Sequence, residues 1–371
     1  MANNTSIWAN TLVKQGCRLA LDADGSLYAY AEGFYRPKGD IYVERLFYNQ
    51  LARFGRSPEW TSRQASEIVK YLQLSSPQLW EVPPAGTLNL LNGLLDVNTL
   101  QLTPHSSDFL SSVQLPVAYE PSARCPRIDT FLQQVFPVDT LDLAYEIFGV
   151  LAVPGEGQDK AITLLGTGGN GKSVFQYVLT TFLGPSNVSA WPLQKLETDR
   201  FAVAELSHKL VNISADLPGT PLVETSIFKN ITGGDRLMAE RKYHPAFEFS
   251  PFCRILYACN ILPLSSDTTN AYFVRHLVIP FTQVFRGTSR ELPRNLMNES
   301  LTTPAELSGL LNKALAGLAR FRANNHAYTK SPSTEEAFQD FKTTVDPFGA
   351  WVRQHMIPSS GDYVVKSDLV E

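Results

Sequence analysis

One octapeptide constrains the fold of this chain more than any other feature of its 371 residues. Residues Gly166–Ser173, with the sequence GTGGNGKS, fit the pattern GxxxxGK[ST]. A short apolar run, Ala161–Leu165, precedes the octapeptide, and the apolar residues after it, from Val174 to Phe182, recur at helical spacing. A strand, a glycine-rich turn and a helix in this order predict an α/β domain with a parallel central sheet.

The chemistry of this turn suits a nucleoside triphosphate. Glycines let the backbone curl until successive N–H groups point at phosphate oxygens, and the start of a helix adds its positive dipole end. A lysine at the position of Lys172 reaches the β- and γ-phosphates, while a hydroxyl at the position of Ser173 is a ligand for Mg²⁺. We therefore expect ATP and Mg²⁺ to be bound by Gly166, Thr167, Gly168, Gly169, Asn170, Gly171, Lys172, Ser173 and Val174.

Three further apolar runs predict the rest of the sheet. They are Leu210–Ile213, Ile255–Cys259 and Leu277–Ile279, and each is bounded by polar residues. Short apolar runs of this kind are typical of central strands that are covered on both faces. Because Pro154–Gly157 marks a break in the pattern, we expect the α/β core to span residues 156–290.

The regions on either side of this core have different patterns. Residues 1–155 mix aromatic strands, turns and helices, and we predict an accessory and collar region that supports oligomerisation. Residues 291–371 are expected to be helical at first and then to enter a partial winged-helix-like end, with a helix at Pro347–His355 and an apolar strand at Tyr363–Val365. The chain stops at Glu371 without a closing element, which predicts that it is cut from a longer protein.

Three polar residues near the strands are candidates for catalysis. Asp216 follows a strand, where a carboxylate holds Mg²⁺ or polarises the attacking water; the alternative is an exposed strand-end aspartate, and Glu205 is a weaker candidate. Asn260 ends the next strand, where an amide can orient the hydrolytic water, although such an asparagine is otherwise a turn residue. Arg275 precedes the last strand and can enter a neighbouring subunit's nucleotide site as an arginine finger, with a surface arginine as the alternative.

A basic segment lies between the second and third of these strands. Its pattern predicts a hairpin from Leu237–Tyr243 and Phe247–Phe249. Cations on a hairpin make sequence-independent, salt-sensitive contacts with the backbone of single-stranded DNA. We predict Lys242, His244 and Arg241 as the DNA contacts, against the alternative of a solvated basic turn.

Composition excludes few classes of protein. The hydrophobic fraction of 44% and the charged fraction of 18% are those of a globular protein. The net charge of −4 gives no overall basic field, yet a basic loop is still compatible with nucleic-acid binding. The four cysteines lack CxxC spacing, so we expect buried free thiols rather than zinc ligands. Without a signal-peptide pattern or an apolar run of about 18 residues, we expect a soluble, cytoplasmic protein with no membrane partner.

The motifs, in this order and spacing, resemble those of superfamily 3 helicases. The similar branch is that of phage and plasmid primase-helicases and of the poxvirus primase-helicase. The resemblance covers roughly residues 20–290 and rests on Gly166–Ser173, Ala215-Asp216, Phe228–Asp235, Arg241–Tyr243, Ala258–Asn260, Val274-Arg275, Ile279–Phe281, Leu90–Asp96, Pro116–Pro121 and Phe148-Gly149. Two positions depart from the pattern: Asp216 is a single carboxylate where many relatives have two, and Val274 stands where relatives often have a second arginine.

The resemblance implies an AAA+-like ATPase core that works as a ring, usually a hexamer, with ATP sites between subunits. It further implies 3′-to-5′ movement on single-stranded DNA, unwinding of forked DNA, and usually a primase domain in the same polypeptide or a primase partner. In such relatives the basic hairpin points into the ring channel. A viral or phage protein of this kind would act in the cytoplasm of the host cell.

A pair of carboxylates near the amino terminus permits a different interpretation. Asp22 and Asp24 resemble the paired carboxylates that hold two metal ions in primases. We favour a hairpin turn instead, because Asp24-Gly25 is a typical turn sequence and no run of histidines or carboxylates near residues 40–110 completes a metal site.

The sequence therefore predicts an ATP-dependent replicative DNA helicase motor, part of a primase-helicase of a virus, phage or plasmid. An alternative is a nucleotide-switched DNA-binding ATPase, of the origin or packaging type, that holds DNA without unwinding it. A third interpretation, a small-molecule kinase with a P-loop, predicts a monomer with an acceptor pocket.

Overall fold

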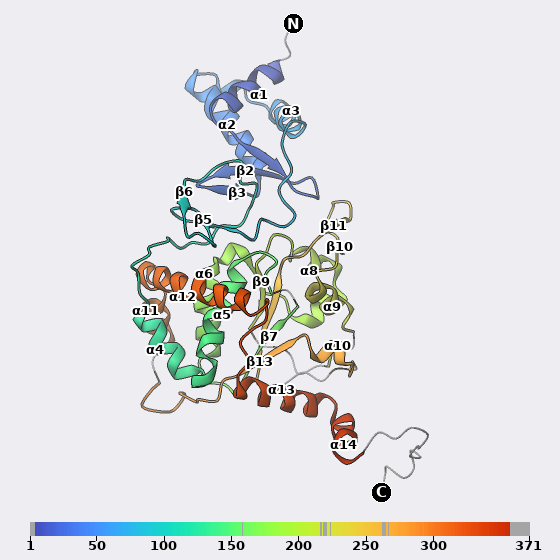
Figure 1. Ribbon diagram of the computed structural model, residues 1–371. Coiled ribbons are helices and arrows are strands. Elements are labelled where there is room, and N and C mark those ends of the chain that lie inside the picture. The colour runs from blue at the N-terminus through green and yellow to red at the C-terminus, as the bar shows by residue number, and fades with distance from the viewer. Residues whose placement is uncertain are drawn as a thin grey trace.

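The chain forms an elongated molecule whose regions follow one another along its length. The computed structural model describes residues 4–157, 159–215, 217, 221–222, 224–261, 265, 267–291 and 293–356. Helices lie at the amino-terminal end, two small antiparallel sheets follow, then an α/β unit, and two helices lie at the opposite end (Figure 1).

The amino-terminal region has three helices that pack beside a small sheet. The elements are α1 (Asn4–Lys14), β1 (Leu19–Leu21), β2 (Leu27–Ala31), β3 (Phe34–Arg36), α2 (Gly39–Arg53), η1 (Ser57–Glu59) and α3 (Ser62–Gln73). Apolar residues one helical turn apart, such as Val43 and Phe47, are buried in the core of this region. β1 and β2 are antiparallel and flank Asp24-Gly25, which confirms the predicted hairpin. A second antiparallel sheet follows, with β4 (Thr87–Leu90), β5 (Gly93–Asp96) and β6 (Leu102–Thr103).

Two helices before the α/β unit share its hydrophobic core. They are α4 (Pro126–Val135) and α5 (Leu141–Ala152), with η2 (Val138–Thr140) between them. The later helix α12 (Pro304–Ala323) packs on α5 so closely that a Cβ on Gly149 would lie 2.1 Å from the carbonyl oxygen of Ala314. The hydrophobic core thus runs across position 155, where the sequence pattern predicted a domain boundary.

The α/β unit is built on a five-stranded parallel sheet in the order β13-β7-β12-β9-β8. Its strands are β7 (Ala161–Leu165), β8 (Val188–Ser189), β9 (Val211–Ser214), β12 (Arg254–Cys259) and β13 (His276–Pro280). The parallel sheet and four of its strands confirm the prediction, whereas the short edge strand β8 was not predicted. Strand β12 lies between β7 and β9, so the polar residues that follow these three strands meet at one edge.

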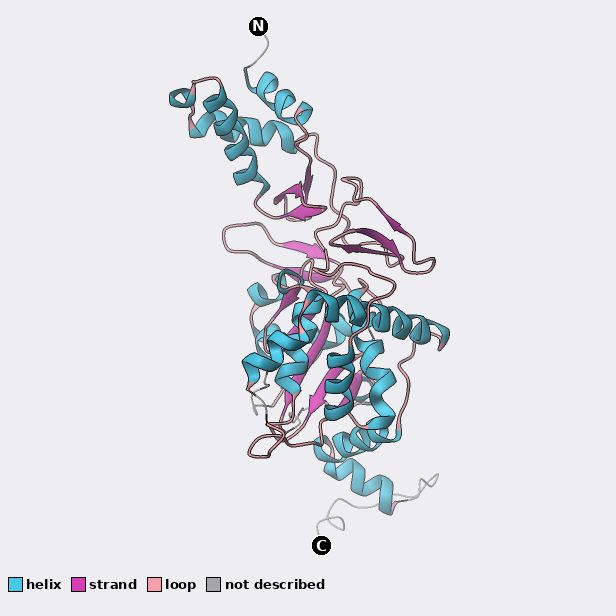
Figure 2. Ribbon diagram, turned by 90° about the vertical axis from the view of Figure 1, so that its left-hand side faces the viewer, coloured by secondary structure: helices cyan, strands magenta, loops and turns pink. Residues whose placement is uncertain are grey.

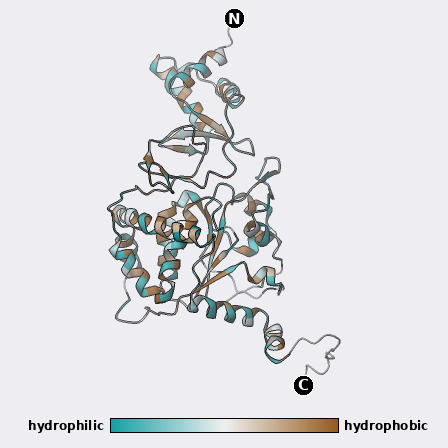
Figure 3. Ribbon diagram, in the orientation of Figure 1, coloured by the Kyte–Doolittle hydropathy of each residue, from teal (hydrophilic) through white to brown (hydrophobic). Residues whose placement is uncertain are grey.

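Both faces of this sheet are covered by helices (Figure 2). Alternate residues of β12 enter two different hydrophobic clusters, Leu256 and Ala258 on one face and Ile255 and Tyr257 on the other. Helices α4, α5, α6 (Lys172–Leu183) and α12 supply the first cluster. Figure 3 shows the same division, with hydrophobic residues gathered in the strands and on the helix faces that meet them.

The remaining elements lie mostly on the second face and at the carboxyl end. They are η3 (Pro185–Asn187), α7 (Leu193–Thr198), α8 (Arg200–Ala204), α9 (Ser226–Gly233), β10 (Leu237–Ala239), β11 (Phe247–Phe249), α10 (Asn270–Phe273), α11 (Arg294–Leu301), α13 (Pro332–Val345) and α14 (Pro347–His355). The predicted helix before residue 356 is confirmed as α14, while the predicted strand of a winged-helix-like end, Tyr363–Val365, lies outside the described residues. The four cysteines are buried free thiols, as predicted. Of the helices in the described ranges, none is both long and apolar enough to cross a bilayer.

Candidate functional site

The glycine-rich turn after β7 adopts the backbone that its sequence requires. Gly168, Gly169 and Gly171 have φ angles of 102°, 65° and 92°, a region in which side chains are strained. A Cβ on Gly171 would also lie 2.6 Å from a methyl group of Val135. Gly171 precedes the first residue of α6, so the helix begins at the turn with its N–H groups directed toward it.

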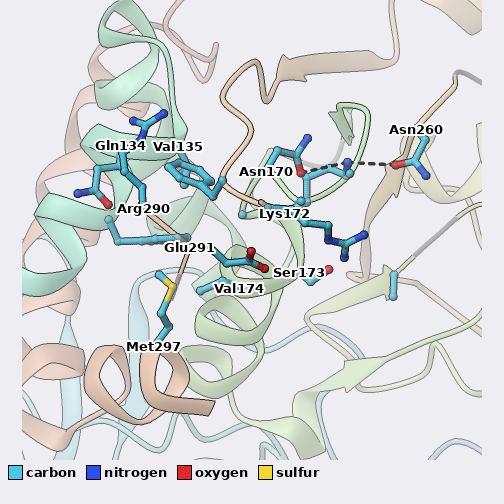
Figure 4. Close-up of a pocket in the computed structure, with 17 residues that line it drawn as sticks. Gln134, Val135, Asn170, Lys172, Ser173, Val174, Asn260, Arg290, Glu291 and Met297 are labelled. Atoms are coloured by element: carbon cyan, nitrogen blue, oxygen red, sulfur yellow. Dashed lines mark hydrogen bonds between the residues drawn. The ribbon is translucent and has the colours of Figure 1, made fainter. Parts of the chain in front are cut away.

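Lys172 is held inside this turn by oxygen atoms from two strand ends. Its side chain is buried, with only 7% of the residue exposed. The ammonium group donates to the carbonyl of Gly166, and to the Oδ1 atoms of Asn170 and Asn260 at 3.3 Å each. Figure 4 shows Asn170 and Asn260 on either side of the lysine. The amide of Asn170 is itself fixed, because its Nδ2 donates to the carbonyl of Phe281 at 3.2 Å.

A cavity of about 400 Å³ opens beside Lys172. Of the predicted nucleotide-binding residues, Gly168 to Val174 line it, whereas Gly166 and Thr167 lie outside its lining. Ala215, at the end of β9, also lines it, but its neighbour Asp216 lies outside the described residues. The structure thus brings the turn, the end of β9 and Asn260 around one cavity.

Part of the cavity wall comes from residues that the sequence motifs did not indicate. Helix α4 contributes Phe131, Gln134 and Val135, and the segment after β13 contributes Phe285, Arg286, Arg290, Glu291 and Met297. Figure 4 shows Gln134, Arg290, Glu291 and Met297 grouped on the side of the cavity away from Asn260. One signal could have found the second group: the carboxyl ends of parallel strands lie at one edge, so the segment after β13 must leave the sheet beside the turn.

Arg275 lies away from the cavity of its own chain. It stands just before β13, and its carbonyl accepts a hydrogen bond at 2.7 Å from the N–H of Ala161, the first residue of β7. Because β7 and β13 are parallel, Arg275 is at the opposite end of these strands from the glycine-rich turn. Its guanidinium donates to the carbonyl of Ala271 at 2.6 Å. The structure therefore does not bring Arg275 together with Lys172 within one chain.

The predicted basic hairpin is present, and its cations are in different environments. Strands β10 and β11 pair antiparallel, with Leu237 opposite Phe249. Lys242 and His244 are exposed near the tip, beside Tyr243, which is 97% exposed. In Figure 1 the hairpin points toward the amino-terminal region.

Arg241, in contrast, is held by the Asp22 and Asp24 pair. Its Nη1 contacts the carboxylate of Asp24, which has no exposed surface, and lies 3.8 Å from the carboxylate of Asp22. Burial lowers the pKa of the Arg241 guanidinium. His208 bonds to Asp22 at 2.7 Å. Burial tends to raise the pKa of the Asp22 carboxyl, but the hydrogen bond and charge of His208, with the charge of Arg241, outweigh it, so this pKa lies below its ordinary value.

A second ion pair also fixes the hairpin to the amino-terminal region. The guanidinium of Arg236 donates to both oxygens of Glu81, at 2.9 and 3.0 Å, and Ser250 donates to the same carboxylate at 2.9 Å. The carboxylates that resembled a primase metal site therefore serve as ion-pair partners in a turn, and Asp24 also accepts from the N–H of Ser26 at 2.8 Å.

Two family descriptions match parts of this chain. Residues 46–137 match the family described as D5 N terminal like. Residues 164–275, which contain the glycine-rich turn and the hairpin, match a family of unknown function, DUF5906.

Two curated relatives come from invertebrate iridescent viruses. The chain is 28% identical over 213 residues to "Putative helicase 121R" of Invertebrate iridescent virus 3, an alignment that covers 52% of the chain and 22% of the relative. It is 22% identical over 213 residues to "Putative helicase 184R" of Invertebrate iridescent virus 6, covering 53% of the chain and 22% of the relative. The match thus spans about a fifth of the length of these relatives.

The fold is similar to solved structures of the C-terminal region of NrS-1 in its apo form. One of them aligns with a TM-score of 0.58 at 13% identity and covers 94% of this chain and 79% of that one. Another aligns with a TM-score of 0.57 at 13% identity and covers 95% and 81%.

Fold and cavity together define an α/β protein in which the glycine-rich turn Gly166–Ser173, a P-loop, lies between β7 and α6. Residues 46–137 match the D5 N terminal like family, two viral relatives are named as putative helicases, and the solved structures share the fold. The chain is thus similar to proteins of the phage and viral primase-helicase type.

Proposed function

We propose that this chain is the ATP-driven motor of a DNA helicase within a primase-helicase. The observation that carries the proposal is the contact between Lys172 and Asn260. Lys172 is the first residue of α6, and Asn260 follows β12, the strand beside β7 in the sheet. This contact places an ammonium group and a polar amide at one cavity, where a triphosphate and its attacking water can be positioned together.

The site suits a magnesium–triphosphate complex. The N-terminus of α6 and the Lys172 ammonium group favour phosphate oxygens, and Ser173 lines the same cavity with a hydroxyl that suits Mg²⁺. Asp216 follows the lining residue Ala215 and is the proposed second Mg²⁺ ligand. Bound Mg²⁺ would neutralise charge that develops on the phosphates. In this proposal Asn260 orients the water, and Arg275 acts on the site of a neighbouring subunit, a role that agrees with its place at the opposite end of β13 from its own cavity.

The DNA-contacting element in this proposal is the β10–β11 hairpin. Lys242 and His244 are exposed near its tip and are available to phosphate groups, while Arg241 is engaged by the amino-terminal region. ATP hydrolysis would move the hairpin and draw one strand of a fork through a ring, with a hexamer and 3′-to-5′ polarity expected from the family resemblance.

The three regions of the chain would have separate roles. Residues 1–155 would support assembly of the ring, and residues 156–290 would form its motor. Residues 291–371 would form the start of a winged-helix-like unit beside a primase domain or partner. We propose that the protein acts in the cytoplasm of a host cell.

Strand displacement tests this proposal. The wild-type chain should displace a labelled strand from forked DNA with ATP and Mg²⁺, and Lys172→Ala should lose both displacement and ATP hydrolysis. Lys195→Ala removes an exposed lysine of α7 and is the matched control, which should behave as the wild type.

A nucleotide-switched DNA-binding ATPase is the second candidate. The observation that favours it is the pair of ion-pair clusters, at Arg236 and Arg241, that fix the hairpin to the amino-terminal region. Such a protein would hydrolyse ATP and bind DNA without displacing a strand at low salt. Hydrolysis without displacement would therefore reject the motor in favour of the switch.

A further inference from the structure

The segment after β13 crosses the P-loop and is bonded to it. The N–H groups of Phe285 and Arg286 both donate to the carbonyl of Gly169, at 2.8 and 3.3 Å. Upstream, the N–H of Phe281 donates to the carbonyl of Leu165, the last residue of β7. Since the same segment is tied at two points, its side chains have a defined place at the mouth of the cavity.

Arg286 lies against the P-loop within this segment. The position that a Cβ on Gly169 would take is 2.6 Å from the Arg286 Cβ and 3.6 Å from its Nε atom. The side chain lines the cavity and is otherwise exposed. Across the described ranges of the chain, no ion pair with a carboxylate includes Arg286.

Arg290 shares the cavity wall but has partners in its own segment. Its guanidinium lies over the ring of Phe285, 5.0 Å from the centroid, and its Nη2 donates to Gln283 at 3.4 Å. Glu291 also lines the cavity and would oppose an anion, although its carboxylate accepts a hydrogen bond at 2.8 Å from the N–H of Gly287. Arg286 is therefore the arginine of this segment whose charge is directed at the P-loop.

We propose that Arg286 binds the terminal phosphates of a nucleotide in the cavity of its own chain. This inference rests on the proposed function, since it requires ATP in the cavity. Arg286 lines one cavity with Lys172, the residue that reaches the β- and γ-phosphates, and its Nε lies 3.6 Å from the position of a Cβ on Gly169 in the same turn, so its guanidinium is assigned to the same end of the triphosphate. A guanidinium presents a planar fork of donors that matches two phosphate oxygens. Arg286 is thus a phosphate-binding residue that acts within one chain, while Arg275 serves the neighbouring one.

Nucleotide affinity tests the assignment. The probes are ATP and ADP that carry a fluorescent N-methylanthraniloyl group on the ribose, titrated with the full chain in Mg²⁺. Arg286→Ala should weaken ATP binding by about 10- to 100-fold, as for a lost hydrogen bond to a charged group, and should weaken ADP binding by less than about threefold. Arg286→Lys keeps the charge without the fork and should restore part of the ATP affinity.

Arg63→Ala removes an exposed arginine of α3, which does not line the cavity, and is the control that should keep the preference for ATP. Unchanged ATP affinity in Arg286→Ala, or equal losses for ATP and ADP, would overturn the role at the terminal phosphates. The same would follow if Arg290→Ala alone lost ATP affinity. Failure of the proposed function is a different result: Lys172→Ala would then bind ATP as tightly as the wild type. The midpoint of thermal unfolding is measured for each variant. A midpoint equal to that of the wild type shows that a loss of affinity does not come from misfolding.

Discussion

Arg241 and Lys242 are adjacent on the hairpin, and we predict opposite consequences when each is replaced by alanine. Arg241 is 27% exposed and lies next to a carboxylate with no exposed surface, so Arg241→Ala leaves Asp24 buried without its cation. Breaking a buried ion pair in this way costs about 3–5 kcal/mol, and we expect about 3 kcal/mol because the arginine keeps some exposure. The stacking of Arg241 on Phe247, at 5.2 Å, is lost as well.

Lys242 is exposed, so Lys242→Ala should change the free energy of unfolding by no more than about 0.5 kcal/mol. Its effect should appear in DNA binding. Loss of one phosphate contact lowers the slope of the logarithm of the binding constant against the logarithm of the salt concentration by about 0.7 for single-stranded DNA. Arg241→Ala should leave that slope unchanged.

Two assays measure these quantities. Urea denaturation gives the free energy of unfolding, and fluorescence anisotropy of a dye-labelled single strand at several salt concentrations gives the slope. In an Asp24→Asn background, Arg241→Ala should cost less than it does in the wild type, because the buried charge is already gone. If Arg241→Ala lowers the slope as Lys242→Ala does while the free energy of unfolding stays at the wild-type value, Arg241 is a DNA contact and not a buried ion-pair partner of Asp24.

Three other predictions concern packing, pH and subunit contacts. Gly149→Ala should destabilise the fold by about 1–3 kcal/mol through overpacking against the backbone of α12, whereas Gly86→Ala, where a Cβ meets open space, should be neutral in the same thermal unfolding assay. The pKa of Asp22 is lowered in the fold, so its carboxylate stabilises the protein above the unfolded value of about 4, and this contribution is lost as the pH falls through the folded value. Urea midpoints between pH 3 and 7 should therefore depend less on pH in Asp22→Asn than in the wild type. An equal pH dependence of the two proteins would contradict this role of the Asp22 carboxylate. If Arg275 acts on a neighbouring subunit, an equimolar mixture of Arg275→Ala and Lys172→Ala chains should regain about a quarter of the wild-type ATP hydrolysis, as random pairing of subunits in a ring requires, and no recovery would contradict an action of Arg275 between subunits.

The local pattern of the sequence was enough to predict the P-loop and the sheet. The turn after β7 depends on glycines at fixed positions, and each central strand is a short apolar run, so both can be found without tertiary contacts. The order of the strands is a different matter. That β12 lies between β7 and β9, and brings Asn260 to Lys172, follows from long-range packing that no local pattern encodes.

The ion pairs of the hairpin show a further limit of the sequence. Arg241 looks like its basic neighbours in the sequence, yet its partner Asp24 lies 217 residues earlier in the chain. Asp22 and Asp24 were correctly predicted to form a turn, but the cation and the histidine that face them could not be. Arg286 was missed because no spacing rule connects it to Gly166–Ser173, although both lie at the carboxyl edge of one sheet.

Stimulation of ATP hydrolysis by DNA tests most directly whether events in the cavity are coupled to the hairpin. The ratio of the hydrolysis rates with and without single-stranded DNA should be well above one for the wild-type chain and should fall close to one for Lys242→Ala. A ratio in Lys242→Ala that equals the wild-type ratio, at a DNA concentration that saturates both proteins, would contradict the coupling of the P-loop to this hairpin.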